Sequence, residues 1–201
     1  MIKRNLLVMG LAVLLSACGF QLRGTGTYEL AFKELDLSAR NSYGETVTML
    51  RQVLESSGVN IHTGAPYKLV LADEQESQRI LSYAGAGRTG EYQVTTVLSY
   101  DISGEHNLHL LSDKLEVQKV FIHDGNNLVG SDQEATDARK EIRRELVQRM
   151  MLRLQQLSPA QLDQLQQTAE AKAKAEAAAL EAAQKAEAET PRQSPVEIPQ
   201  Q

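Results

Sequence analysis

The sequence has little of what enzymes use for catalysis. Only one of its 201 residues is a cysteine, and it contains no Gly-x-Ser-x-Gly nucleophile pattern and no His-Glu-x-x-His metal pattern. His106 and His109 are close enough in sequence to share a metal, but no third ligand of matching spacing lies nearby. Two solvated loop histidines are the simpler interpretation. The sequence therefore predicts no catalytic residue, no metal site and no cofactor, and argues against an enzyme.

One glycine pattern matches a ligand-binding motif in its letters. Gly85-x-Gly87-x-x-Gly90 has the spacing of a dinucleotide-binding loop. That motif needs a strand before it and a helix after it, whereas the residues from Tyr92 onward form the clearest strand pattern in the chain. We interpret the glycines as a connection between two strands, with nucleotide binding as the weaker alternative.

No apolar run is long enough to cross a membrane. The longest, Leu6 to Leu15, reaches about 15 Å as a helix, half of a hydrocarbon core of roughly 30 Å. Lys3 and Arg4 precede it, and the small residues Ser16 and Ala17 lead from it to Cys18. This is the pattern of a bacterial lipoprotein signal peptide. We therefore predict that residues 1–17 are a leader and that Cys18 is the lipidation site.

Lipidation decides how the mature protein meets the membrane. A diacylglycerol and an N-acyl chain on Cys18 provide more than the two membrane signals that stable anchoring requires. Gly19 stands where lipoproteins kept in the inner membrane usually carry aspartate. We expect a protein anchored by its lipid on the periplasmic side of the outer membrane, which it does not cross.

Basic residues are too few to suggest nucleic acid as a partner. Removing Lys3 and Arg4 with the leader leaves 19 of the 21 basic residues against 26 acidic ones, a formal charge of −7. Nucleic-acid-binding domains carry basic patches. The 42% of hydrophobic residues instead indicate a globular domain.

Large apolar residues are nearly absent from the C-terminal segment. Residues 169–189 are almost wholly Ala, Glu, Lys and Gln, with Leu180 as the only large apolar side chain, and three prolines follow. A coiled coil would need an apolar seam every 3.5 residues. We predict a short helix capped by Ser158 and Pro159, then a solvated helix and a disordered tail. The chain thus divides into one domain, residues 18–157, and a tail, residues 158–201.

Within residues 18–157 the apolar periodicity changes several times. Ser42-x-x-Glu45 and Ser131-x-x-Glu134 have capping-box spacing and predict two helix starts, while Gly58 predicts a helix end. The expected elements are extended pieces at 20–23 and 33–37, a helix over 44–57, extended pieces at 59–63 and 67–72, strands at 92–103 and 111–122, and a helix over 131–157.

The strand over Tyr92 to Ser103 shows the clearest alternation. Its even positions are mostly apolar and its odd ones, including Gln93, mostly polar, so one face should be buried and one wet. The apolar positions of 111–122 change parity, which predicts a β-bulge near Gln118. Together the elements predict an α+β two-layer sandwich, with a mostly antiparallel or mixed sheet of about four strands and two helices packed on one face.

The start of the mature chain resembles a known family. Cys18-Gly19-Phe20-Gln21-Leu22-Arg23-Gly24 is similar to the mature N-terminus of the LPS-assembly lipoprotein LptE (RlpB) family, and Glu91-Tyr92 after a glycine-containing loop is similar to another of its segments. The order of strands and helices over residues 18–157 also agrees, whereas the tail lies outside the resemblance.

The resemblance implies a partner role without catalysis. Members of the family bind the outer-membrane barrel LptD, sit within it, assist its assembly, and contact lipopolysaccharide delivered from the periplasm. In the family, basic residues on the glycine-containing loop and just before the last helix contact lipopolysaccharide. Here the stretch 126–132 before the last helix contains no cation.

Lipopolysaccharide carries phosphates, which a net-negative protein must bind through local cations. Arg88, beside two glycines at the loop tip, is the first candidate, with a solvated loop charge as its alternative role. Lys119 and Arg79 are weaker candidates, which we expect on the wet faces of strands. A second hypothesis for the whole protein is a structural periplasmic lipoprotein that acts as a spacer or tether through its C-terminal tail.

Overall fold

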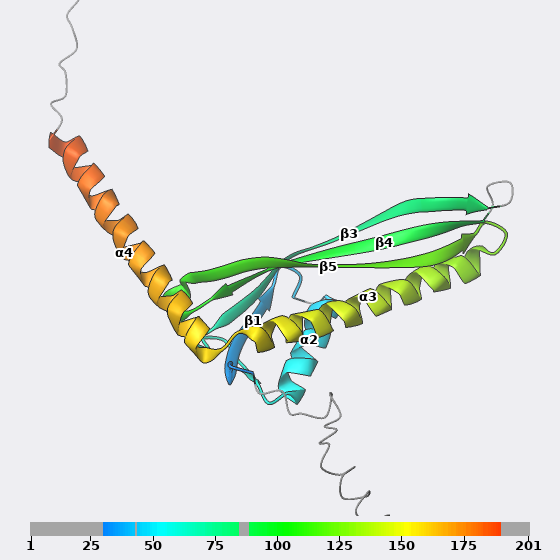
Figure 1. Ribbon diagram of the computed structural model, residues 1–201, viewed down its shortest axis with the longest axis horizontal. Coiled ribbons are helices and arrows are strands. Elements are labelled where there is room, and N and C mark those ends of the chain that lie inside the picture. Colours follow the sequence, from blue (N-terminus) through cyan, green and yellow to red (C-terminus); the bar gives the residue numbers. More distant parts are fainter. Residues whose placement is uncertain (1–29, 43, 85–88, 190–201) are drawn as a thin grey trace, which may run out of the picture.

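The computed structural model describes residues 30–42, 44–84 and 89–189. A five-stranded sheet has two helices, α2 and α3, on one face, and a further helix, α4, projects from one end of the sheet (Figure 1). The elements are β1 (Glu34–Ala39), α2 (Glu45–Ser56), β2 (Asn60–Ile61), β3 (Lys68–Ala84), β4 (Thr89–Ser103), a short 3₁₀ turn (Glu105–Asn107), β5 (His109–Asp124), α3 (Leu128–Gln156) and α4 (Pro159–Glu189). The predicted α+β sandwich is confirmed, with five strands instead of about four.

The sheet is mixed, in the order β2-β1-β3-β4-β5. The short strands β1 and β2 are parallel, and β1 is also parallel to β3. The three long strands β3, β4 and β5 form an antiparallel meander. β1 reaches along β3 only as far as Leu71, so the outer part of the meander is three strands wide.

The burial of β4 follows the predicted alternation. Val94, Leu98, Tyr100 and Ile102 face the helices and are almost fully buried. Gln93 is the exception on the opposite face, which we call the open face: its side chain is only 5% exposed. The alternation identified the face correctly, but neighbouring side chains, described below, contribute to the burial of Gln93.

β3 runs from Lys68 to Ala84, well beyond the predicted end at Ala72. The stretch from Asp73 to Arg79 is polar and, from Glu74 on, exposed, so it lacks the apolar alternation that marks a strand. Pairing with β4 keeps it extended, because the backbone hydrogen bonds of a ladder do not depend on side-chain polarity. The register shifts between Leu71 and Asp73 and between Ile80 and Ser82.

The predicted β-bulge near Gln118 is wrong. β4 and β5 pair without interruption from Thr89 opposite Asp124 to Ile102 opposite Leu111, and the irregularity lies at the hairpin end instead. The parity of the apolar residues changes because Val120 and Ile122 lie on the open face, where they are 54% and 59% exposed.

Both predicted capping boxes are misplaced, although both helices exist. α2 has Gly44 as its N-cap, and the Ser42 hydroxyl donates instead to the Ala39 carbonyl. α3 begins a turn earlier than predicted, with the Asn127 side chain accepting from the Gly130 amide. Ser131 is consequently buried within the first turn, where its hydroxyl accepts from the Asp124 amide.

Other predicted helix features are confirmed. Gly58 follows α2 with φ of 85°, a conformation that glycine adopts without strain. The apolar stripe of α3 is buried along its length, through Ala135, Ala138, Ile142, Leu146, Met150 and Leu154.

α4 is a single helix and not a short one followed by a second segment. The Ser158 hydroxyl accepts from the Gln161 amide while the Gln161 side chain accepts from the Ser158 amide, a reciprocal cap. Leu162 in the second turn is 1% exposed and belongs to the same core as the sheet. From Lys174 onward the described side chains are exposed. Neither α4 nor any other described helix is both long and apolar enough to cross a bilayer.

Candidate functional site

The far ends of the three long strands form the most unusual surface of the molecule. We call it the strand tip: residues 78–84 of β3, 89–94 of β4 and 119–124 of β5, together with the first turn of α3. All of them lie at the end of the sheet opposite α4 (Figure 1). Of the predicted site residues, Arg79 and Lys119 lie here, whereas Cys18 and Arg88 lie outside the described residues.

Apolar side chains are exposed at the strand tip. Seven large apolar side chains of β3, β5 and α3 are each at least two-fifths exposed: Ile80, Leu81, Tyr83, Val120, Ile122, Leu128 and Val129. Scattered single apolar residues are common on protein surfaces, whereas several of them gathered at one end of a sheet indicate contact with another molecule. Ile80 faces the helix side, across from Tyr92, whereas Val120 and Ile122 lie on the open face.

Tyr92 supports the helix side of the tip. Its ring lies 5.8 Å from that of Phe121 and 5.0 Å from that of His123, measured between centroids. Phe121 is buried and joins these rings to the core. The tip is thus exposed but stiffened by aromatic packing.

A row of hydrogen bonds crosses the open face at the tip. Arg79 Nε donates to Gln93 Oε1 at 2.7 Å, and Gln93 Nε2 donates to Gln118 Oε1. Gln93 is thus held between Arg79 and Gln118, which contributes to its burial. Among the residues that the structure describes, no carboxylate lies within ion-pair distance of Arg79, so its remaining N–H groups face solvent. These N–H groups of Arg79 are free to donate hydrogen bonds to an anion.

Lys119 lies on the face opposite to the one predicted. The register places it opposite Val94, on the helix side, where its Nζ lies 3.3 Å from Glu145 and 3.8 Å from Glu141 of α3. Arg149 is the main cause of a lowered pKa at Glu145, and Lys119 contributes in the same direction. The charge of Lys119 is therefore already matched within the protein, unlike that of Arg79.

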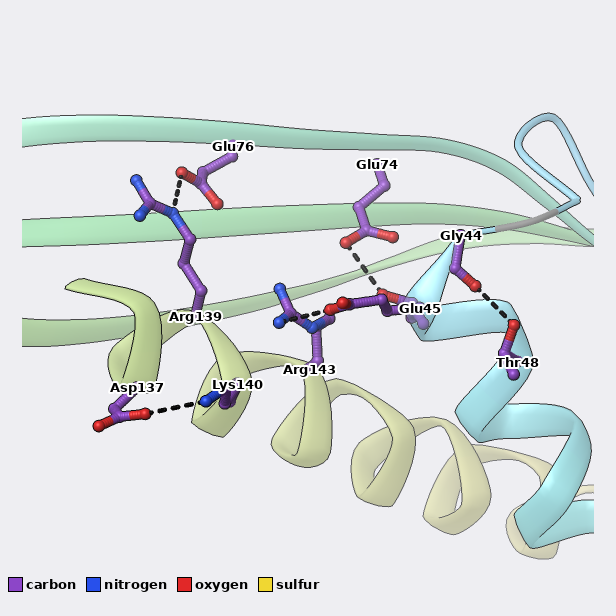
Figure 2. A network of polar contacts seen from close by, with 10 residues as sticks. Gly44, Glu45, Thr48, Glu74, Glu76, Asp137, Arg139, Lys140 and Arg143 are labelled. Carbon is purple, nitrogen blue, oxygen red and sulfur yellow. Dashed lines mark hydrogen bonds and ion pairs between the residues drawn. The ribbon is translucent and has the colours of Figure 1, made fainter. Parts of the chain in front are cut away.

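Further along the helix side, polar contacts connect α2, α3 and β3 (Figure 2). Arg143 of α3 pairs with Glu45 of α2 at 2.5 Å, and Arg139 of α3 with Glu76 of β3 at 2.8 Å. The hydroxyl of Thr46, a buried residue of α2, donates to Glu74 of β3 at 3.0 Å. All of these residues except Arg139 line a cavity of about 330 Å³. Every charged group named here has an internal partner, so we assign this network to holding the layers together.

The described histidines do not form a catalytic or metal site. His109 Nε2 lies 2.7 Å from Ser112 Oγ, but that hydroxyl donates to Asp101, so the imidazole is not placed to take its proton. His106 lies in the turn between β4 and β5 with φ of 60°. Over residues 30–42, 44–84 and 89–189, no group of three or more metal-ligating side chains is gathered.

Sequence reasoning missed Gln93 and the exposed apolar group. The group draws on three elements, and its β3 members follow the polar stretch that concealed the strand. The paired apolar residues Ile80-Leu81 were the available signal, since two large apolar side chains beyond a polar stretch indicate a second extended segment.

The sequence of this chain is similar to those of known proteins. The family described as LptE, lipopolysaccharide-assembly, matches residues 32–154. An LPS-assembly lipoprotein LptE from Pectobacterium atrosepticum is 30% identical over 162 residues, covering 77% of this chain and 86% of that protein. The LptE of Yersinia enterocolitica is 28% identical, covering 81% of this chain and 80% of that protein.

Two solved structures share the fold. The rare lipoprotein B of Shewanella oneidensis superposes with a TM-score of 0.54 at 21% identity, covering 60% of this chain and 91% of that one. Lipoprotein B of Nitrosomonas europaea superposes with a TM-score of 0.59 at 18% identity, covering 73% and 96%. The region matched by the family, residues 32–154, includes all five strands, α2 and most of α3. On the strength of this sequence match, the chain belongs to the LptE family of lipopolysaccharide-assembly proteins.

Proposed function

We propose that this chain is an outer-membrane lipoprotein that partners the LptD barrel in the assembly and transport of lipopolysaccharide to the outer-membrane surface, and that it contacts lipopolysaccharide itself. Cys18 carries the lipid anchor, and the domain lies on the periplasmic side. The role requires no catalysis. Membership of the LptE family supports the proposal.

The observation that carries the lipopolysaccharide contact is the composition of the strand tip. Exposed apolar side chains stand beside Arg79, whose guanidinium has no described acidic partner. Lipopolysaccharide combines acyl chains with phosphates. Its acyl chains can pack against the exposed apolar side chains, and its phosphates can pair with Arg79. Arg88, which lies between β3 and β4 in the sequence, would add a second cation. Lys119 is the weakest of the three, because Glu141 and Glu145 already hold it.

The barrel partnership is supported by the shape of the domain. An open sheet face that carries polar side chains, such as those of Gln75, Ser77 and Gln118, suits the polar lumen of an outer-membrane barrel. The experiment is purification of the tagged, lipidated chain from detergent-solubilised outer membranes. We expect LptD to co-purify in a stoichiometric band. Recovery of the lipidated chain without the barrel would contradict the partnership.

The tether hypothesis has one observation in its favour. α4 projects away from the sheet and extends to Glu189 (Figure 1). The described side chains of its second half are exposed, so a partner could bind there. The two hypotheses differ in what truncation does. A chain that ends at Ala171 keeps the buried Leu162 and should retain the barrel, whereas a tether would lose its partner.

A further inference from the structure

One edge of the sheet is open. β1 pairs with β3 only through Leu71, and β4 pairs with its other side. From Asp73 to Ile80 no described strand lies on the outer side of β3, and no described side chain bonds its backbone there. Register shifts bound this segment at both ends. It offers about 26 Å of regular, unpaired edge.

The hydrogen-bond pattern shows which groups point outward. Arg149 Nη1 donates to the Glu116 carbonyl at 2.6 Å, so the backbone of Glu116 faces away from β4. Its partner Val97 must therefore bond on the other side, to Gln75 of β3. Alternation then turns the N–H and C=O groups of Glu74, Glu76 and Gln78 outward.

The opposite edge of the sheet, on β5, is capped at Glu116 among the described residues. On β5 the outward Glu116 carbonyl is bonded by Arg149, and the Lys119 side chain is held across to α3. Segment 73–80 has no proline and no lysine, the residues that usually block an edge. Its acidic side chains Glu74 and Glu76 are drawn down to α2 and α3 (Figure 2). They do not reach across the edge.

We propose that the outer edge of β3 from Glu74 to Ile80 takes up an extended segment of the barrel partner as an added strand, in line with β1. The inference rests on the proposed partnership with the barrel and names the surface through which part of it forms. A row of alternating backbone donors and acceptors is matched by another polypeptide backbone, which a lipid does not offer.

The side chains beside the edge specify the segment further. On the open face, Asp73 is already paired with Arg40 at 3.6 Å and accepts from Gln75, whereas Arg79 near the tip has no described acidic partner. A complementary segment therefore places an acidic residue beside Arg79. On the helix side, the exposed Ile80 favours an apolar residue near the tip.

Amide hydrogen exchange, resolved to single residues by mass spectrometry, tests the inference on the wild-type chain. In the free chain the amides of Gln75, Ser77 and Arg79 should exchange slowly, because they bond to β4, while those of Glu74, Glu76 and Gln78 exchange fast. In the complex with LptD all six should be slow. Fast exchange of the second set in an intact complex would overturn the inference.

A proline variant provides the second test. Gln78→Pro removes an outward N–H and leaves the ladder to β4 intact, so its melting temperature should match that of the wild type. Recovery of LptD should fall about tenfold, whereas the control Gln78→Val, which keeps the N–H, should stay within about twofold. Equal recovery with both variants would also overturn the inference. If Gln78→Pro does not fold, the exchange measurement decides.

The pattern of results separates this inference from the proposed function. If the wild type recovers LptD normally while the outward amides still exchange fast in the complex and Gln78→Pro has no effect, that result contradicts strand addition at the β3 edge but leaves the partnership with LptD intact. Absence of LptD from wild-type preparations contradicts both.

Discussion

The two ends of the long strands differ in what covers them. At the near end, residues 68–71, 99–103 and 109–114, α2, β1 and α4 close around the sheet, and Leu69, Tyr100 and Ile102 are buried. At the strand tip, α3 is the one described element beneath the sheet, and Ile80 remains exposed on that side, as do Val120 and Ile122 on the open face.

The sequence of α3 changes in step with this difference. Toward the tip its buried stripe consists of the small residues Ser131, Ala135 and Ala138, whereas further along it consists of Ile142, Leu146, Met150 and Leu154. Small side chains contribute less buried apolar area. More apolar surface is therefore buried near α4 than at the tip, which leaves the tip available for a partner.

The largest contrast should come from truncating one apolar residue at each end. Leu69→Ala, at a fully buried position of the near end, should lower the free energy of unfolding by about 2–5 kcal/mol. Ile122→Ala at the tip should change it by no more than about 0.5 kcal/mol. Urea denaturation of the domain measures both. Comparable losses would remove the distinction between the two ends.

Cutting the chain sharpens the boundary of the near end. A chain that ends at Leu157 loses Leu162 from the core, which should cost about 1.5–3 kcal/mol and several degrees of melting temperature. A chain that ends at Ala171 keeps Leu162 and should melt like the full chain. If both cuts leave the melting temperature unchanged, the domain ends at 157 as the composition predicts.

Charge reversal compares Arg79 with Lys114, two cations on the open face, and adds Arg88 as a third position. Arg79→Glu at the tip should weaken lipopolysaccharide binding by about 1.5–3 kcal/mol, and Arg88→Glu should act alike. Lys114→Glu at the near end should have little effect, although it reverses a charge on the same face. Titrations at two salt concentrations check this, because added salt screens exposed charges. Equal affinities for all variants would make Arg79 and Arg88 solvated charges.

The smallest effect appears only at high pH. Burial raises the pKa of Tyr100 to about 12, and Asp113 adds to the shift. The folded state holds this proton more tightly than the unfolded state, whose tyrosine pKa is about 10. Stability from this group is therefore full below pH 10 and falls as the pH rises toward 12. Unfolding free energies at pH 9 and 11.5 should differ less in Tyr100→Phe than in the wild type.

Much of the fold could be predicted because its elements bury one regular face. The alternation of β4, the stripe of α3 and the cap at Ser158 and Pro159 are local signals, and each was confirmed. The outer half of β3 could not be predicted, since its ladder to β4 is backbone pairing across the hairpin. Lys119 was predicted on the open face but lies on the helix side, for a related reason. The face on which it lies depends on the pairing of β4 with β5, which runs without the expected bulge.

The candidate site divides in the same way. The sequence by itself determined the leader pattern, the place of Cys18, the family, and which residues are cations, because these depend on residue identity and spacing along the chain. Only the tertiary structure decided that Glu141 and Glu145 hold Lys119 while Arg79 faces solvent over Gln93. It also decided that β3 has an open edge. Which charges are matched and which strands lack a neighbour depends on contacts between residues far apart in sequence, and those exist only once the chain is packed.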